Sequence, residues 1–418
     1  MTPRRDNFAL ILGAAFSRSL SIGFLGVVLG IYLARRGFSA AAIGAVLAAG
    51  LAGSALTTLA VSLYADHLGR KRFLVALSAL AALGGIGLPF TSHLAWVLFI
   101  AFFGTLNGLG TDRGPLFALE QAVLPQIAPG APTVGFAWYN VVLDAGHALG
   151  ALAGSLPLLL SKWSSLDIST AYRIAFLGYA TLNFLSALLY ISLADSVELL
   201  HGRPDIRRPP MTLQTKKTLA RLTGLFSLDS FGGGLIADAM LAYWFFVRFG
   251  ASEAALGPLF FATHALNSAS YPVAAWLAQR VGLLNTMVFT HLPSSLFLAG
   301  VAVAPSFPWA VGLLLARESL ASMDVPARQA YVTAIVTPQE RTFASGVTNL
   351  TRNLVRAIAP SVAGFLMQNL SVAAPILAGS GAKISYDLIL YAGFRKTHLE
   401  SEETEEDPAR AAFLKTEK

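Results

Sequence analysis

The sequence contains no cysteine among its 418 residues, and this absence excludes several kinds of chemistry at once. Disulfide bonds, thiolate zinc ligands and cysteine nucleophiles all need a residue type that the chain does not have. Charged residues are also scarce, at 13% of the chain, whereas a soluble domain carries about a quarter. Because 55% of the residues are hydrophobic, we expect much of the surface to face lipid.

Catalytic and nucleotide-binding motifs are missing as well. The sequence has no G-x-x-x-x-G-K-[ST] phosphate loop and no cluster of acid, base and nucleophile. Its run of three glycines, Gly232-Gly233-Gly234, lies inside an apolar segment, where it weakens a helix. We therefore expect no cofactor, no metal and no enzymatic activity. A multipass membrane enzyme or a sensor is the alternative from another class, although no soluble domain is appended.

Long apolar runs are what the sequence has in place of these features. They approach the roughly 20 residues that a bilayer-spanning helix needs. Arg4 and Arg5 precede the first run, as in a cleaved signal peptide, but the run resumes after Arg18 and reaches Leu33, which favours a retained helix. The pattern predicts an all-α polytopic membrane protein with twelve spans at 8–33, 40–64, 73–91, 95–111, 135–160, 172–193, 220–247, 254–277, 284–304, 309–327, 346–369 and 372–394.

The net charge of +7 is distributed in a way that indicates topology. With an even number of spans both termini lie on one side, and most basic residues outside the spans fall on that side. The positive-inside rule then places both termini in the cytoplasm of a cell carrying the protein in its plasma or inner membrane. Nucleic acid is accordingly not expected as a partner. The opposite side holds mainly Arg35, Arg36, Lys162, Arg173 and Arg248.

The chain also repeats itself. EQAVLPQIAP at 120–129 returns as RQAYVTAIVTP at 328–338, and a basic, proline-containing stretch at 201–218 separates six spans from six. The segment ADHLG at 65–69 aligns with AQRVG at 278–282 at a similar shift. Parallel repeats of this kind are typical of transporters. They predict an N-terminal half at 1–200, a cytoplasmic linker at 201–219, a C-terminal half at 220–396 and a charged cytoplasmic tail at 397–418.

The stretch LYADHLGRKR at 63–72 resembles the loop between helices 2 and 3 of the major facilitator superfamily, which reads roughly G-x-L-A-D-R-x-G-R-K/R. It departs from that pattern at Ser62, Tyr64 and His67. The resemblance implies two six-helix halves around a central cavity and secondary transport by alternating access. The matching residues are Ala65, Asp66, Gly69, Arg70 and Lys71.

Gating residues are predicted in two places. In the matched loop, a carboxylate next to cations can contact a helix N-terminus or an arginine of a neighbouring helix and release it when the halves move; the alternative is that the basic residues only set orientation. At the cytoplasmic end of helix 10, Arg317 precedes Asp324 and Arg328 on one stripe, with a solvated loop as the alternative. The predicted gating residues are Asp66, Gly69, Arg70, Lys71, Asp324 and Arg328, with Asp112, Arg113 and Glu120 at the equivalent place between helices 4 and 5.

Substrate contacts are predicted from polar residues at membrane depth, where an ionisable group is costly unless it is paired or hydrated. Helix 5 presents three such residues at i, i+4 and i+7, hence on one face, and helix 11 presents a matching set. A polar seam that joins helix to helix explains the same pattern. The predicted substrate-binding residues are Arg18, Asn140, Asp144, His147, Asn349, Asn353 and Arg356.

Proton coupling is predicted at Asp238, Asp144 and Glu318. Asp229 and Asp238 are nine residues apart and point to opposite faces if the helix is regular, and Asp238 lies deeper. An isolated buried carboxyl takes up protons more readily; pairing with Arg18 or Arg356 is the alternative. His264 is expected to be structural, and so are Lys383 and Asp387, which are four residues apart and can pair with each other.

These patterns together predict a transporter of a small solute, coupled to protons. Gly146-x-x-x-Gly150-x-x-x-Gly154 indicates close helix packing, and it partly resembles a motif of drug–proton antiporters of the superfamily, which slightly favours efflux. An uncoupled facilitator and an uptake symporter for a polar or charged metabolite are the alternatives. The expected partners are the solute, protons and the lipid bilayer.

Overall fold

The computed structural model describes residues 3–112, 114–127, 132–194, 197–198, 213–335 and 341–395, and the regular elements in these ranges are all helical. Those of the N-terminal half are α1 (Pro3–Arg35), α2 (Ala40–Leu68), α3 (Arg70–Gly87), the 3₁₀-helix η1 (Leu88–Phe90), α4 (Leu94–Phe103), α5 (Pro115–Ile127), α6 (Pro132–Ala153), α7 (Leu156–Ser164) and α8 (Ile168–Ile191). Those of the C-terminal half are α9 (Leu213–Leu235), α10 (Asp238–Phe249), α11 (Glu253–Val281), α12 (Leu283–Ala302), α13 (Phe307–Ala321), α14 (Asp324–Ile335), α15 (Arg341–Asn369) and α16 (Ala374–Phe394).

We count four pairs of consecutive helices as one interrupted crossing each: α4 with α5, α6 with α7, α9 with α10, and α13 with α14. Counting each pair once confirms the predicted twelve crossings and the all-α membrane fold. Five helices of the described ranges are long and apolar enough to cross a membrane alone, or six if α9 and α10, bent by 40°, form one span. The other crossings are shortened by their breaks or contain more polar residues, which neighbouring helices shield from lipid.

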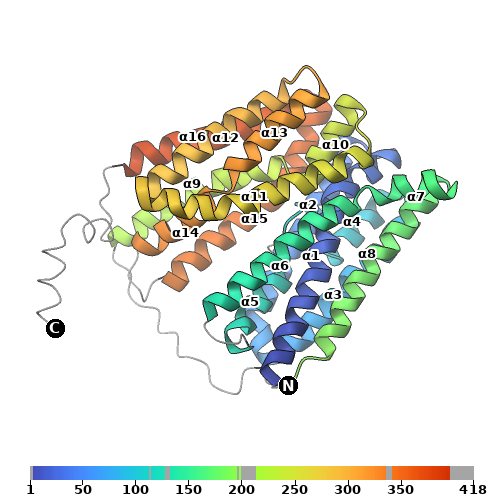
Figure 1. Ribbon diagram of the computed structural model, residues 1–418, viewed down its shortest axis with the longest axis horizontal. Helices are drawn as coiled ribbons and strands as arrows, with labels where there is room; N and C mark the ends of the chain where they lie inside the picture. Colours follow the sequence, from blue (N-terminus) through green and yellow to red (C-terminus); the bar gives the residue numbers. More distant parts are fainter. Residues whose placement is uncertain are drawn as a thin grey trace, which may run out of the picture.

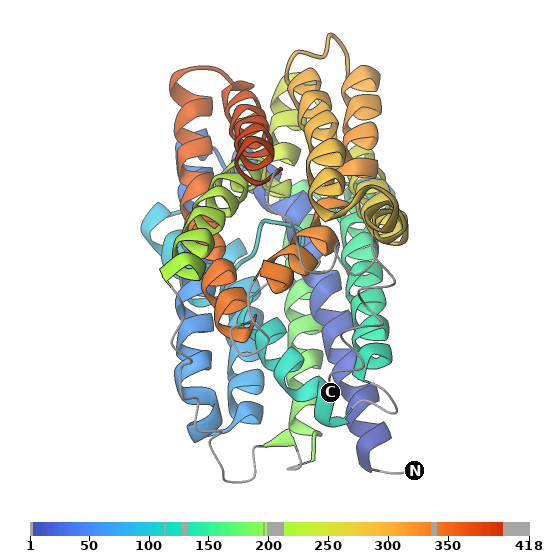
Figure 2. The ribbon, with the colours of Figure 1, turned by 90° about the vertical axis from the view of Figure 1, so that its left-hand side faces the viewer.

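The two halves lie side by side, with α1–α8 in blue to green and α9–α16 in yellow to red (Figure 1). Turned by 90°, most long helices run roughly along a common axis, with the N-terminus at one end (Figure 2). Helices of different halves pack in pairs, chiefly α2 against α15, α6 against α11 and α1 against α10. These helix pairs form the interface between the halves, and any movement of one half relative to the other must change their contacts.

Contacts between the halves are closest toward the end remote from the N-terminus. A Cβ built on Gly44 of α2 would lie 2.2 Å from the Pro360 carbonyl oxygen of α15, and one on Gly30 of α1 would lie 2.2 Å from the Ala239 carbonyl oxygen of α10. Glycine therefore lets the backbones touch there. We call this region, at the last turns of α1 and the first turns of α2 and α11, the closed end.

The predicted repeat is visible in the backbone at two glycines. Gly69, between α2 and α3, has φ +104° and donates its N–H to the Ala65 carbonyl at 2.9 Å. Gly282, between α11 and α12, has φ +84° and donates its N–H to the Ala278 carbonyl at 3.1 Å. Both end one long helix and start the next in a conformation that L side chains rarely adopt. The aligned glycines thus have the same structural role in both halves.

Replacing Gly69 by alanine is expected to destabilise the protein by about 1–3 kcal/mol, because a non-glycine residue is strained at this φ and its Cβ would lie 3.2 Å from a Glu198 carboxylate oxygen. Gly178→Ala in α8 is the matched control, since nothing lies within 4 Å of a Cβ there and alanine favours a helix. Thermal unfolding of the purified variants measures the difference. Equal melting temperatures for the two variants would contradict the strain argument.

Candidate functional site

A cluster of ionised residues is buried inside the N-terminal half. Arg18, in the middle of α1, pairs through its two terminal nitrogens with Asp112 and Glu120. Glu120 also accepts hydrogen bonds from the hydroxyls of Tyr139 at 2.7 Å and Tyr190 at 2.6 Å. Burial of charges is tolerated only with such pairing. Arg18, predicted to bind substrate, is 2% exposed and is held within its own half in this conformation.

A second cluster lies inside the C-terminal half around Asp229 of α9. Its carboxylate lies 2.8 Å from the Lys383 ammonium nitrogen, 3.4 Å from an Arg328 guanidinium nitrogen and 3.5 Å from His291 Nε2. Asp387 contacts the other ring nitrogen of His291 at 2.9 Å. The expected pairing of Lys383 with Asp387 is therefore wrong, because each binds a residue of another helix. Asp229, which sequence reasoning ranked below Asp238, is the centre of the cluster.

The two clusters occupy equivalent places in the repeat but have opposite polarity. Glu120 and Arg328 each precede the duplicated Gln-Ala pair, in α5 and α14. Their ion-pair partners are Arg18 on the first crossing and Asp229 on the seventh. The N-terminal half thus has a cation on its first helix and an anion on α5, and the C-terminal half has the reverse.

The second group of predicted gating residues was placed wrongly. Asp112, Asp324 and Arg328 were expected near the cytoplasmic ends of their helices, but they are buried. Asp112 pairs with Arg18 in the middle of α1, Arg328 pairs with Asp229 of α9, and Asp324 pairs with Arg328 within α14. The reason is that each crossing breaks and then resumes as a further helix, α5 or α14. The expected single stripe through Arg317 is likewise interrupted after Ala321. Arg113 lies outside the described residues.

The loop that matched the family pattern is tied to its own half. Arg70 Nε lies 2.8 Å from Asp66 Oδ1, and the backbone N–H groups of Arg70 and Lys71 donate to the Glu198 carboxylate at 2.7 and 3.1 Å. The Lys71 ammonium group donates to the Leu193 carbonyl at 2.6 Å. Glu198, which sequence reasoning missed because it follows the sixth span without a motif, therefore anchors this loop to the end of α8.

Titratable groups also form a row across the interface between the halves. Asp238 begins α10 directly after the break at 236–237, and its carboxylate lies 3.1 Å from His264 Nε2 on α11. The ring of His264 lies 6.2 Å, centroid to centroid, from that of His147 on α6. His147 Nε2 in turn accepts the Asp112 backbone N–H at 3.1 Å. The row runs from the C-terminal half to the N-terminal cluster.

Two glycines of the N-terminal half leave the space in which the Asp238 side chain packs. A Cβ on Gly110 would lie 1.9 Å from Asp238 Oδ2, and one on Gly26 would lie 3.3 Å from Asp238 Cβ. The Ala239 N–H donates to the Gly108 carbonyl at 3.0 Å across the same contact. Because α9 and α10 are separated by a break, the rule that Asp229 and Asp238 face opposite ways on a regular helix does not apply.

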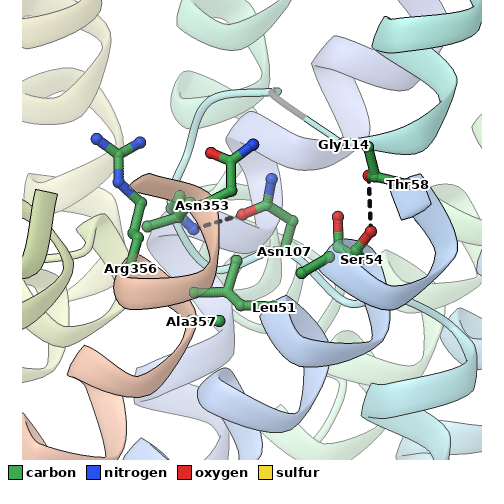
Figure 3. Close-up of a pocket in the computed structure, with 10 residues that line it drawn as sticks. Leu51, Ser54, Thr58, Asn107, Gly114, Asn353, Arg356 and Ala357 are labelled. Carbon is green, nitrogen blue, oxygen red and sulfur yellow. Dashed lines mark hydrogen bonds between the residues drawn. The ribbon is translucent and has the colours of Figure 1, made fainter. Parts of the chain in front are cut away.

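A pocket lies between the halves, where α15 approaches α2 and the segment joining α4 to α5; its empty space, including the part open to solvent, is about 360 Å³. Figure 3 shows Asn353 and Arg356 of α15 across from Ser54 and Thr58 of α2, with Asn107 between them. Asn353 and Arg356 were predicted to contact substrate. Ser54 was missed because it lies in an apolar run. The pocket is lined by Leu51, Ser54, Ala55, Thr58, Asn107, Leu109, Gly114, Asn353, Arg356 and Ala357.

The other predicted site residues are distributed over the two edges of the interface. On α6, which packs against α11, Asn140 is exposed, Asp144 is half-buried and His147 is buried. Asn349 is exposed on α15, which packs against α2. The two predicted trios therefore lie on different edges and do not form one compact site. Glu318 is buried, pairs with Arg317 and accepts a hydrogen bond from Asn267 at 2.9 Å.

Comparison with known proteins supports the fold. The family model of the Major Facilitator Superfamily matches residues 11–360 and 222–416. An uncharacterized membrane protein of Saccharomyces cerevisiae is 26% identical over 414 residues, covering 91% of this chain and 92% of the yeast protein. The nucleoside transporter NupG superposes with a TM-score of 0.71 at 14% identity, covering 95% of this chain and 100% of NupG. A bacterial homologue of the human lysosomal transporter Spinster gives 0.71 at 14% identity, covering 94% and 96%.

Proposed function

Since the chain belongs to the major facilitator superfamily, we propose that this transporter carries a small polar solute by alternating access and couples the movement to protons. The row of Asp238, His264 and His147 across the interface of the halves carries this proposal. A titratable group at that interface changes its surroundings whenever the halves move, and so it can bind a proton from one side and release it to the other.

Alternating access is supported by the contacts that hold one end of the interface closed. At the closed end, glycine contacts are joined by an ion pair in which Arg35 of α1 binds Glu253 of α11 through two hydrogen bonds of 2.9 and 3.0 Å. We call this the Arg35–Glu253 latch. Tyr172 of α8 also donates to the same carboxylate. Rocking of the halves has to break these contacts to open that end.

The solute class follows from the pocket between α2 and α15. Its polar lining consists of amides, hydroxyls and a single guanidinium, that of Arg356. Amide and hydroxyl groups bind neutral polar groups, and a guanidinium binds a carboxylate or phosphate. We propose a polar solute with hydrogen-bonding groups and at most a small negative charge.

Topology and direction complete the proposal. From the basic residues on the side of the N-terminus, we propose that both termini lie in the cytoplasm of a cell whose plasma or inner membrane holds the protein, so that the closed end faces outward. We propose efflux as the direction, from the partial resemblance of the Gly146–Gly154 run to antiporters. In the structure this run packs α6 on α1: a Cβ on Gly150 would lie 2.0 Å from the Leu20 carbonyl oxygen.

The test uses the purified protein in liposomes that enclose a pH-sensitive dye, with a panel of polar solutes added outside. We expect Asp238→Asn to reduce solute-evoked proton movement by about a hundredfold, in line with the loss of a positioned proton-transfer group, while solute counterflow persists. His264→Gln is expected to act in the same direction.

His93→Gln is the matched control for the histidine, because His93 is exposed and its side chain makes no cap hydrogen bond to α4. Solute movement with no proton signal in the unaltered protein would replace coupling by facilitated diffusion. Coupling that survives in Asp238→Asn would remove Asp238 from the proton path.

A further inference from the structure

A second pocket lies within the N-terminal half at the closed end, between the end of α1, η1 and the start of α8; its empty space, including the part open to solvent, is about 360 Å³. Its polar lining includes three guanidinium groups, two phenol hydroxyls and the Ser169 hydroxyl. Few basic residues lie on the side of the protein opposite the N-terminus, and three of them are arginines that line this one pocket. They are Arg35, Arg36 and Arg173, with Tyr32 and Tyr172 beside them.

Arg36 is fixed in position by neutral acceptors. Its guanidinium donates to the Tyr32 hydroxyl at 2.9 Å and to the carbonyls of Pro89 and Thr91 at 3.2 Å each. Such bonds orient the group without compensating its charge. Arg173 lies over the Phe90 ring, 5.7 Å from its centroid, a contact that also preserves the charge.

Two carboxylates face these guanidiniums. Glu253 is fully buried and binds Arg35 in the latch. Asp167 is exposed and caps α8 by accepting the Thr170 N–H at 3.0 Å. Hydrogen bonding from the Thr170 side chain, then from its backbone, and to a smaller extent Arg173, hold the pKa of the Asp167 carboxyl below the ordinary value. Three cations therefore face two anions, of which one is committed to Arg35 and the other to the helix cap.

We propose that this pocket binds an anionic group of the carboxylate or phosphate class, with Arg36 and Arg173 as its principal ligands. Guanidinium groups match the planar or tetrahedral oxygens of such anions and bind them in pairs of hydrogen bonds. The group comes either from a free anion in solution or from the headgroup of an acidic lipid, since the pocket lies near the membrane surface. The site is separate from the pocket between α2 and α15 and does not depend on the proposed proton coupling.

Anion binding in this pocket affects the Arg35–Glu253 latch, because Arg35 belongs to both the pocket and the latch. An anion in the pocket competes with Glu253 for the Arg35 guanidinium, which weakens the link between α1 and α11. By thermodynamic linkage, removal of the Arg35–Glu253 ion pair must then strengthen anion binding. Glu253→Gln is accordingly expected to raise the anion affinity by about tenfold, the effect of one charge-assisted contact of about 1.4 kcal/mol.

The test measures thermal stabilisation of the full chain in a neutral detergent by inorganic phosphate and by sulfate, against chloride at equal ionic strength. Arg173→Gln is expected to weaken phosphate binding about tenfold. The double variant that carries Arg36→Gln as well is expected to lose phosphate binding. Lys162→Gln is the control, because Lys162 is an exposed cation of the same end that does not line the pocket.

A lipid-binding experiment distinguishes a free anion from a lipid headgroup as the ligand. Native mass spectrometry of protein extracted from bilayers with phosphatidylglycerol is expected to show a retained acidic lipid that Arg173→Gln loses if the headgroup is the ligand. Binding of phosphate alone, lost in the same variant, assigns the site to a soluble anion. Failure to bind either anion, or equal binding by Arg173→Gln and Lys162→Gln, overturns the proposal.

Discussion

Asparagine in place of Asp229 is expected to destabilise the protein by about 3–5 kcal/mol, because removal of one partner leaves buried charges uncompensated. The Asp229 carboxylate lies 2.8 Å from the Lys383 nitrogen and 3.4 Å from an Arg328 nitrogen. Native proteins are stable by only about 5–15 kcal/mol, so little folded protein should be recovered. The measurements are the yield of monodisperse protein in detergent and its thermal unfolding temperature.

Asp167→Asn provides the control for the same chemical change, since Asp167 is an exposed helix cap and asparagine caps as well as aspartate. Addition of Lys383→Gln to Asp229→Asn is expected to recover part of the lost stability, because it removes one of the stranded cations. If Asp229→Asn melts at the temperature of Asp167→Asn, the cluster is not held by this carboxylate.

Alanine in place of Gly44 is expected to shift the equilibrium between closed and open states of the closed end by about tenfold or more. Its Cβ would lie 2.2 Å from the Pro360 carbonyl oxygen and 3.0 Å from the Gly364 Cα. Both are backbone atoms, so α2 and α15 must separate, and overpacking of this kind costs about 1–3 kcal/mol. Opening of the closed end separates α2 from α15 and relieves this steric clash.

The absence of native cysteine makes the measurement direct. Spin labels on Lys162→Cys and Arg248→Cys, exposed positions of the two halves at this end, report the distance across it by pulsed electron resonance. Gly381→Ala in α16 is the control, because no atom lies within 4 Å of a Cβ there. An unchanged distance distribution in Gly44→Ala would contradict the steric argument.

Hydropathy predicted the number of crossings because lipid imposes a length and a composition on most of them. It failed at α5, which was expected to be a loop, and at the part of α14 that lies beyond the predicted span 309–327. Pro125 inside α5 and the polar residues of α14 resemble loop sequence, but both helices contribute residues to buried cores. A helix surrounded by protein needs only a narrow apolar stripe, so hydropathy alone does not detect it.

The charged residues of both clusters were recognisable from sequence as ionisable groups at membrane depth, but their partners were not. Asp229 and Lys383 are 154 residues apart, and no local spacing connects them. Sequence reasoning paired Lys383 with Asp387 because the i, i+4 relation was the one contact that the sequence itself supplied. The row through Asp238 was hidden for a further reason, since it depends on a helix break that only packing determines.

The opposite polarity of the two clusters restricts how the halves can change. Conversion of the Arg18–Glu120 pair into the arrangement of Asp229 with Arg328 requires two substitutions, and either one alone leaves like charges facing each other inside the protein. Such an intermediate loses several kcal/mol and is removed by selection on stability. The two partners of either pair therefore have to exchange their charges together, so a single charge reversal in one half cannot give it the interior of the other half.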